Sequence, residues 1–342
     1  MTDAARDVVL TTRATLVRNL DGMRFPPCLP GRPDDDEARR TQERVEEAFL
    51  RANLRGEYAR LPLDCLKAWE ISALAERGLV DRRLAQRGVE GRAALVRRDQ
   101  RLCACVNDGD HLRMHAVWPG LAPEAAYRAV SGLDAALGET LDYAFDGEYG
   151  YLTADPAEAG TGLRVRVRMH LPALLRGGQT PLARPLCEEL RVGLSRVRDG
   201  DMVELTNVAG MGMSEAEILE TVTTAAHRIV ARERQAREAM LLSDKESLEQ
   251  ALAEALREAA TAQTLRFEHF QTCWSTLRLS VVAGILPHTL DAMDALYLSA
   301  QPGHLGLRAG AFLEDDSRQT ALAELLRATL DETDETYKTL NL

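Results

Sequence analysis

The segment with the most suggestive chemistry runs from Arg164 to Leu171 and reads RVRVRMHL. Its cationic or potentially cationic residues alternate with apolar ones; they are Arg164, Arg166, Arg168 and His170. On a strand, alternating side chains share one face. Four such groups on one face repel each other unless an anion or nearby carboxylates compensate. Two interpretations therefore stay open: a phosphate-binding face, and a solvated or acid-paired face.

A second candidate for chemistry is the pair Cys103 and Cys105, the two cysteines that lie close together among the six in the chain. They belong to the run RLCACVND, which has the composition of a strand, and on a strand both side chains point to one face. A C-x-C spacing alone is a weak indication of zinc. Small buried thiols are the favoured interpretation, so we predict no metal site.

The surrounding sequence predicts the elements that must position these groups. The pattern predicts a strand that leads into a Pro/Gly-rich loop over residues 7–30, and strands in 92–118, 149–171 and 201–207, with two strands in 92–118 joined at 106–110. It predicts helices over residues 35–58, 122–142 and 182–196. Ser214 and Glu217 have capping-box spacing before a long helix. From residue 244 the pattern is almost entirely helical. We therefore predict an α+β domain over residues 1–240 and an all-helical domain over residues 241–342.

Composition limits the kind of protein. The chain has 342 residues, of which 45% are hydrophobic and 28% are charged, as is usual for soluble globular proteins. Its net charge of −11 argues against nucleic-acid binding, which depends on neutralising phosphates, but is compatible with a local anion site. No apolar run approaches the roughly 18 residues that would span a bilayer, and the first residues lack a signal-peptide pattern. We therefore expect a cytoplasmic protein without membrane segments.

Several short strings, in order, resemble one family. TTRATLVRN (11–19), VNDGDHLRM (106–114) and YGYLTADPAEAGTGLR (149–164) are similar to the S-S-R-x-R-L-x-R-N, N-E-E-D-H and G-Y-L-T-x-C-P-T-N-x-G-T-G-L-R motifs of bacterial ATP:guanido phosphotransferases. MHLPAL (169–174), LTN (205–207) and MSEAEI (213–218) follow at similar spacing. LRLSVVAGIL and QPGHL resemble the C-terminal domain of the protein-arginine kinases. The resemblance implies a curved antiparallel sheet flanked by helices, with Mg-ATP as phosphoryl donor to a guanidinium.

The resemblance also assigns the residues that bind ATP. Guanido kinases hold phosphate oxygens in the planar forks of arginine side chains. In this sequence the matching positions are Arg13, Arg113, Arg164 and Arg198, with His111 beside them. The second arginine of the first motif is replaced by Thr15, which removes one cation. We predict that the first three arginines converge on one cleft and that Mg-nucleotide binds more weakly than in an intact family member.

The acceptor side departs further from the family. The carboxylate that orients the guanidinium aligns with Gly109, and Asp108 could substitute for it only if the hairpin shifted. The signature cysteine aligns with Asp155, and the neighbouring asparagine with Glu158. The loop before Asn207 is shortened, which removes the counterpart of a second acceptor glutamate. Losing one orienting group typically costs two to three orders of magnitude in rate, so we predict little or no arginine phosphorylation.

Three hypotheses remain open at this point. The first is a working protein-arginine kinase with an altered acceptor site. The second is a pseudokinase that responds to nucleotide or serves as a protein-interaction module. The third is a scaffold that binds no nucleotide.

The helical tail carries a degenerate version of a further motif. The family's R-D-x-x-R-A string reads phosphoarginine, and here Arg318 keeps its first arginine while Gln319 and Leu322 replace the other two charged residues. The favoured interpretation of Leu322 is that it packs a helix. The resemblance further implies a homodimer formed through the helical domain, a protein client and an activator protein.

Overall fold

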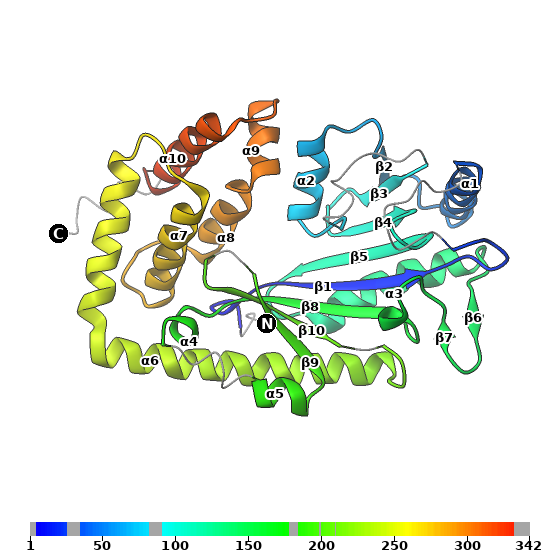
Figure 1. Cartoon of the computed structure of the whole chain (residues 1–342), viewed down its shortest axis with the longest axis horizontal. Helices are drawn as coiled ribbons and strands as arrows, with labels where there is room; N and C mark the ends of the chain where they lie inside the picture. Colours follow the sequence, from blue (N-terminus) through cyan, green and yellow to red (C-terminus); the bar gives the residue numbers. More distant parts are fainter. Residues whose placement is uncertain are drawn as a thin grey trace.

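The computed structural model describes residues 5–25, 35–81, 91–177, 184–197, 200–208 and 210–331. It confirms the α+β class, because an eight-stranded antiparallel sheet with helices packed on it is followed by a helical C-terminal part (Figure 1). Arg198, one of the four predicted phosphate-binding arginines, lies outside the described residues.

The sheet has the strand order β2-β3-β4-β5-β1-β8-β10-β9, and each neighbouring pair is antiparallel. The first strand of the chain, β1, lies between β5 and β8, so residues far apart in the sequence meet at the centre of the sheet. A separate two-stranded hairpin is formed by β6 and β7. The strands are β1 (Val9–Arg18), β2 (Tyr58–Pro62), β3 (Ala93–Arg97), β4 (Leu102–Val106), β5 (Leu112–Pro119), β6 (Phe145–Asp146), β7 (Gly150–Tyr151), β8 (Leu163–His170), β9 (Val192–Arg196) and β10 (Met202–Asn207).

One face of the sheet borders the main hydrophobic core. Leu16 of β1 and Val165 and Val167 of β8 are buried there against α3 (Pro123–Gly138) and the first part of α6 (Glu215–Thr261). Shorter helices lie at the edges: α1 (Asp35–Arg51), α2 (Ala68–Glu76), α4 (Pro172–Arg176) and α5 (Arg184–Glu189). Because side chains alternate along a strand, the other face is left to the intervening residues, which include the arginines.

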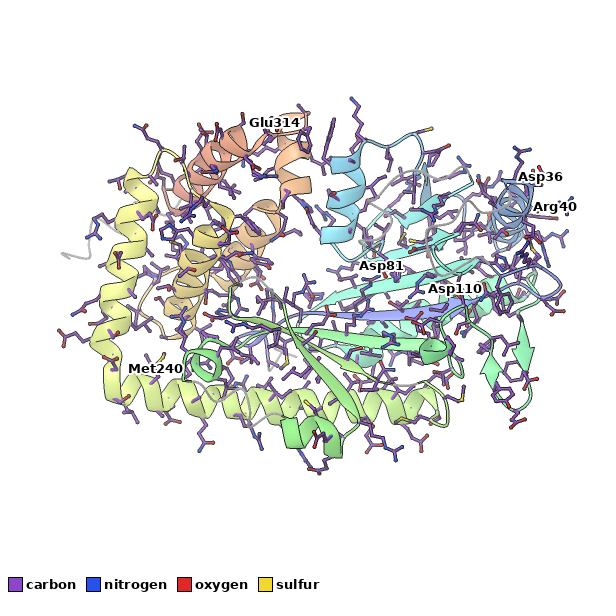
Figure 2. All side chains as sticks on the ribbon, in the orientation of Figure 1. Asp36, Arg40, Asp81, Asp110, Met240 and Glu314 are labelled. Atoms are coloured by element: carbon purple, nitrogen blue, oxygen red, sulfur yellow. The ribbon has the colours of Figure 1, made fainter. Side chains whose placement is uncertain are left out.

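The long helix α6 connects the sheet to the helical part. It begins at the predicted capping box, in which Ser214 N donates to Glu217 Oε2 at 2.7 Å. It bends at Asp244 (φ −152°, ψ 46°), just after Met240, which is marked in Figure 2. Beyond the bend, its second part packs with α7 (Phe267–Val282), α8 (Leu290–Ser299), α9 (Pro302–Ala309) and α10 (Asp315–Asp331). Leu10 and Met202 belong to the same second core, so that core crosses the predicted boundary at residue 240.

A buried polar joint fastens α7 to the sheet. Arg278 is fully buried; its Nε donates to Asp294 Oδ1 at 2.9 Å, and its terminal nitrogens donate to the carbonyls of residues 7 and 6 at 3.0 and 2.9 Å. His170, at the end of β8, lies 2.8 Å from Ser275 Oγ. Burial and then Arg278 hold the pKa of His170 well below its ordinary value, so the imidazole is neutral. His170 is therefore not a fourth cation of the β8 series.

Three predicted elements are wrong in their extent. The helix predicted over 182–196 ends at Glu189, because Val192–Arg196 form β9 and pair with β10. The two strands predicted in 92–118 are three, with a turn between β3 and β4, and the helix predicted over 35–58 ends at Arg51. Each break coincides with a non-glycine residue in the left-handed region, and these residues are Arg191, Gln100 and Asn53. Their side chains give little warning of that conformation.

Candidate functional site

The central strands gather arginines on one sheet face. In the register of the sheet, Arg13 of β1 is opposite Arg166 of β8, and Thr15 is opposite both Arg164 of β8 and His115 of β5. Val17, on the same side of β1, is opposite Arg113. The shared face predicted for the β8 arginines is thus confirmed, and it extends across β1 and β5.

Arg113 and Arg164 converge on a carboxylate, Glu158. Arg113 donates to both oxygens of Glu158, from Nη1 to Oε2 at 2.8 Å and from Nη2 to Oε1 at 3.0 Å. Arg164 Nε lies 3.3 Å from Glu158 Oε1. Arg113 also donates to Asp110 Oδ2 at 3.0 Å. Only 8% of Glu158 is exposed, so this is a largely desolvated four-residue network, and charge-assisted contacts of this kind are strong.

A short turn presents Glu158 to these arginines. The 3-10 turn Pro156–Glu158 is capped by Asp155, whose Oδ1 accepts a hydrogen bond from Ala157 N at 3.0 Å. Asp155 itself is exposed. Asp155, which aligns with the family's cysteine, therefore uses its side chain to cap the turn. Glu158, which aligns with the family's asparagine, contacts the arginines.

Arg13 lines a cavity of about 660 Å³ beside this network. The cavity lies between the arginine face of the sheet, the end of α2, and α8. Its charged lining consists of Arg6, Arg13, Arg77, Arg101, Arg166, Arg168, Glu76, Asp81, Asp99, Glu204 and Asp294. Among the described residues that line it, neither Arg113 nor Arg164 is found. Of the three arginines predicted to share one cleft, this cavity is lined by Arg13, and the convergence of all three stays a prediction.

The Arg13 side chain is held mainly by neutral groups. Its Nη2 lies 2.8 Å from His115 Nδ1, and Thr15 Oγ1 lies 3.0 Å from the same nitrogen. Burial and then the nearby Arg166 lower the pKa of Arg13 to about 10. Arg13 Nε has no hydrogen-bond partner in the described part of the chain. An anion bound in the cavity would offset the energetic cost of desolvating the Arg13 guanidinium and would reduce its repulsion by Arg166.

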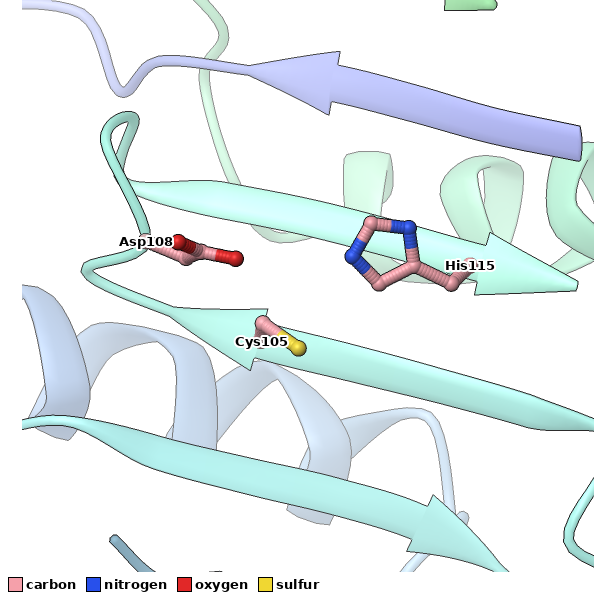
Figure 3. Close-up of side chains that lie close together, drawn as sticks. All are labelled: Cys105, Asp108 and His115. Atoms are coloured by element: carbon pink, nitrogen blue, oxygen red, sulfur yellow. The ribbon is translucent and has the colours of Figure 1, made fainter. Parts of the chain in front are cut away.

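Asp108 lies in a buried cluster with Cys105 and His115, which Figure 3 shows between β4 and β5. One ligand atom of each residue lies within 4.8 Å of the other two. Asp108 is 6% exposed, and its Oδ2 has no hydrogen-bond partner among the described residues. Burial raises the pKa of Asp108 to about 6, and Arg113 opposes that rise. The carboxylate is therefore mostly ionised at neutral pH although it is desolvated.

The two thiols of this region behave as predicted. Cys103 and Cys105 are fully buried on the same side of β4, with their sulfurs 3.7 Å apart. Cys105 Sγ donates to the Leu79 carbonyl at 3.4 Å. Hydrogen bonding to Cys103, followed by burial, raises the pKa of Cys105 well above its ordinary value, so the thiol stays protonated. The prediction of small buried thiols is confirmed.

The tip of the β4–β5 hairpin holds three further residues of its motif, Gly109, Asp110 and His111. Gly109 has φ +74°, and no described heavy atom lies within 4 Å of where a Cβ would be. Asp110 accepts from Asn19 Nδ2 at 2.8 Å and from Ala154 N at 2.7 Å. His111 accepts from Leu20 N at 3.0 Å and lies 3.0 Å from the Arg24 carbonyl. His111 was predicted to bind ATP, but both of its ring nitrogens lie within hydrogen-bond distance of the backbone that follows β1.

The remaining candidates have partners of their own. Arg166 and Arg168 pair loosely with Glu204, at 3.6 and 3.8 Å, so the β8 face is in part acid-paired, as one of the two interpretations held. Arg318 pairs with Asp315 at the start of α10. Leu322 is fully buried in the second core, which confirms that it packs a helix.

Sequence reasoning missed the part that Glu158 plays. The sequence did contain a signal, because Glu158 replaces the family's asparagine. An additional carboxylate near the arginines of the family motifs can form ion pairs with them. The contact itself depends on the path of residues 155–159, which the sequence pattern does not reveal.

No helix in the described part of the chain is both long and apolar enough to cross a membrane.

Family models match almost the whole chain. The model for the ATP:guanido phosphotransferase C-terminal catalytic domain matches residues 40–236, and the model for the protein-arginine kinase McsB C-terminal domain matches residues 245–340. The protein-arginine kinase of Caldanaerobacter subterraneus subsp. tengcongensis is 30% identical over 337 residues, which cover 95% of this chain and 98% of that protein. The protein-arginine kinase of Brevibacillus brevis is 31% identical over 334 residues, covering 95% and 92%.

Solved structures show the same fold. The substrate-free duplicated taurocyamine kinase from Schistosoma mansoni has a TM-score of 0.61 and 20% identity, and the match covers 76% of this chain and 40% of that one. Lombricine kinase has a TM-score of 0.58 and 20% identity, with 68% of each chain covered.

Proposed function

Because the chain belongs to the ATP:guanido phosphotransferase family, together with the protein-arginine kinases, we propose that it binds Mg-ATP at the arginine-bearing face of its sheet and carries out little or no phosphoryl transfer to arginine. Phosphoryl transfer needs positive charge around the phosphates, in-line positioning and a group that aligns the nucleophile. The donor and acceptor sides meet these needs unequally.

The donor side supports nucleotide binding. Arg13, Arg166 and Arg168 border a cavity of about 660 Å³, and Arg13 Nε is still without a hydrogen-bond partner among the described residues. Trp118 lines the same cavity and offers an aromatic surface. Mg²⁺ would arrive as part of the substrate, bound to the nucleotide phosphates.

The acceptor side carries the inference of impairment, and the decisive observation is Gly109. A guanidinium stays protonated to a pKa above about 12 and is a poor nucleophile until carboxylates orient it and assist proton removal. At the hairpin tip, Gly109 provides no side chain and open space instead. Asp155 is occupied as the cap of the 3-10 turn. Asp108, in the same motif, is buried, and its Oδ2 has no hydrogen-bond partner among the described residues.

The test is phosphoarginine formation on a protein substrate, detected by mass spectrometry at neutral pH, for the wild type and three variants. Gly109→Glu should raise the yield, since it restores a carboxylate at the tip; Gly109→Ala is its matched control, because both residues meet the same positive φ. Asp155→Asn should leave the yield unchanged, because asparagine can also cap the turn. A wild type that phosphorylates arginine and loses that activity in Asp155→Asn would contradict impairment.

A pseudokinase is the second candidate, and one observation favours it. Arg113 and Arg164 already contact Glu158, so two of the cations that the family assigns to phosphates have an internal partner. Such a protein would act through a nucleotide-dependent or constitutive contact with another protein. A thermal-shift titration with Mg-ADP together with phosphoarginine detection separates the candidates, because only an active kinase yields the modified product.

The remaining features of the proposal come from the family. We infer that the acceptor is a protein arginine, since the relatives are named protein-arginine kinases. We also propose a cytoplasmic homodimer with a protein client or activator, and two domains that divide near residue 240. Sedimentation of the purified chain tests the dimer.

A further inference from the structure

We propose that Glu158 is an internal anion that takes the place of a ligand's phosphate between Arg113 and Arg164, so that an anion binds there only when the turn Pro156–Glu158 moves away. The proposal rests on the proposed function in one respect, namely the assignment of these two arginines to phosphate binding. It makes Glu158 the residue that sets the affinity of this site for anions.

The contacts of Glu158 are those of a bound oxyanion. Its two carboxylate oxygens accept a pair of hydrogen bonds from the Arg113 guanidinium, at 2.8 and 3.0 Å. The oxygen Oε1 also lies 3.3 Å from Arg164 Nε. Two coplanar oxygens facing a guanidinium fork reproduce the geometry with which arginine holds carboxylate or phosphate. The Glu158 carboxylate therefore fills the sites that a phosphate would use.

Charge leads to the same conclusion. The network contains two guanidiniums, from Arg113 and Arg164, and two carboxylates, from Asp110 and Glu158, so its formal charge is zero. A dianionic or trianionic phosphate finds no surplus positive charge there. With Glu158 displaced, the remaining three groups carry one positive charge next to the cavity in which Arg13 and Arg166 lie.

The arginines stay positioned without Glu158. Arg113 keeps its 3.0 Å hydrogen bond to Asp110, which is fixed in turn by Asn19 and Ala154. Arg164 keeps its 3.1 Å hydrogen bond to the Asn207 carbonyl. Because both side chains have second anchors, displacing Glu158 would expose a preorganised cationic site rather than two loose side chains.

The turn that carries Glu158 is the part that can move. The three residues before Glu158, which are Asp155, Pro156 and Ala157, are exposed. Two backbone hydrogen bonds lie within it: Glu158 N donates to the Asp155 carbonyl at 2.9 Å, and Ala159 N donates to the Pro156 carbonyl at 3.3 Å. In addition, Asp155 caps Ala157 N, and Arg164 Nη2 donates to the Ala157 carbonyl at 3.4 Å. A short exposed turn with two backbone hydrogen bonds opens at low cost compared with a strand of the sheet.

The first experiment measures binding of pyrophosphate and of Mg-ADP by calorimetry to the wild type, Glu158→Gln and Glu46→Gln. Glutamine keeps the size of the side chain and removes its charge. We expect Glu158→Gln to bind pyrophosphate about tenfold or more tightly, the change that a single charge-assisted hydrogen bond can produce. Glu46→Gln is the matched control, because Glu46 also pairs with an arginine, Arg60, and neither of the two lines the cavity; its effect should be smaller.

The outcomes separate this proposal from the proposed function. Unchanged or weaker pyrophosphate binding in Glu158→Gln, with Mg-ADP bound by the wild type, would overturn the internal anion and leave the kinase-family function standing. Tighter pyrophosphate binding in Glu158→Gln, with no Mg-ADP bound by any variant, would support the internal anion and contradict nucleotide binding.

A second measurement uses the wild type alone, in case the variant does not fold. Saturating pyrophosphate should speed the hydrogen exchange of the Glu158 and Ala159 amides, because their turn must open. The amides of β8 on the same face serve as the internal reference. Equal or slower exchange at residues 158 and 159 with pyrophosphate bound would overturn the proposal.

Discussion

Replacing Asp108 by asparagine should make this protein more stable at alkaline pH. Burial raises the pKa of Asp108 from 3.8 to about 6 in the folded chain. A group with a raised folded pKa contributes stability that is fully present below its unfolded pKa and is lost as pH rises through its folded pKa. At about pH 8 the ionised, partly unpartnered carboxylate therefore destabilises the fold.

The size of the effect follows from the shift. A rise of about two pKa units, at 1.36 kcal/mol for each, gives a penalty of about 3 kcal/mol at pH 8. Asparagine removes the charge and keeps the shape, but its amide needs partners of its own, so we expect Asp108→Asn to gain about 1–3 kcal/mol in the free energy of unfolding. Below about pH 4, where aspartate is neutral in both states, the gain should vanish.

The assay is urea unfolding of both proteins at about pH 8 and at the lowest pH at which both stay folded. Asp99→Asn is the control, because hydrogen bonds from Arg97 lower the pKa of the Asp99 carboxyl, so that removing its charge should lower the stability at about pH 8. A gain for Asp108→Asn that is the same at both pH values would refute a burial penalty on this carboxylate. If Asp108 orients the acceptor, the stabilised variant should also lose any residual phosphoarginine formation.

Two further variants test other parts of the structure. Leu322→Ala should cost about 2–5 kcal/mol because the side chain is fully buried, whereas Arg318→Ala, next to it in the degenerate motif, should change stability by less than about 1 kcal/mol; equal losses in chemical unfolding would contradict the packing role. Burial raises the pKa of Glu233, which accepts the Ala173 and Leu174 amides, from 4.5 to about 7, so its neutral form contributes stability that is lost as pH rises through about 7. Glu233→Gln should be less stable overall, through the loss of one acceptor, but its melting temperature should fall less between about pH 5 and pH 8, and an unchanged pH dependence would contradict the burial effect.

The sequence predicted those features that depend on local pattern. Alternation placed the three β8 arginines on one face, and the same rule placed the two thiols together inside β4. The helix start at Ser214 followed from its spacing to Glu217. These predictions succeed because the relevant partner is close in sequence or because one strand geometry fixes the answer.

The features that failed depend on distant partners or unusual backbone. Nothing local distinguishes Val192–Arg196 as a strand until β10 is available to pair with it. Likewise, the burial of Asp108 depends on tertiary packing, and the contact of Arg113 with Glu158 joins residues 45 positions apart in the sequence. Family motifs indicated candidate arginines, but not which of them already has an internal carboxylate as partner.

The joint around Arg278 has a consequence for how the polypeptide is made. Its guanidinium binds the carbonyls of Arg6 and Asp7, which lie 272 and 271 residues earlier in the chain. Leu10 and Met202 likewise enter a core supplied mostly by residues beyond 250. A ribosome must therefore release nearly the whole chain before these early residues find their partners, and until then their apolar surface is open to chaperones. Stop codons introduced near residue 240 should accordingly yield a product that aggregates, although they leave every strand of the sheet in place.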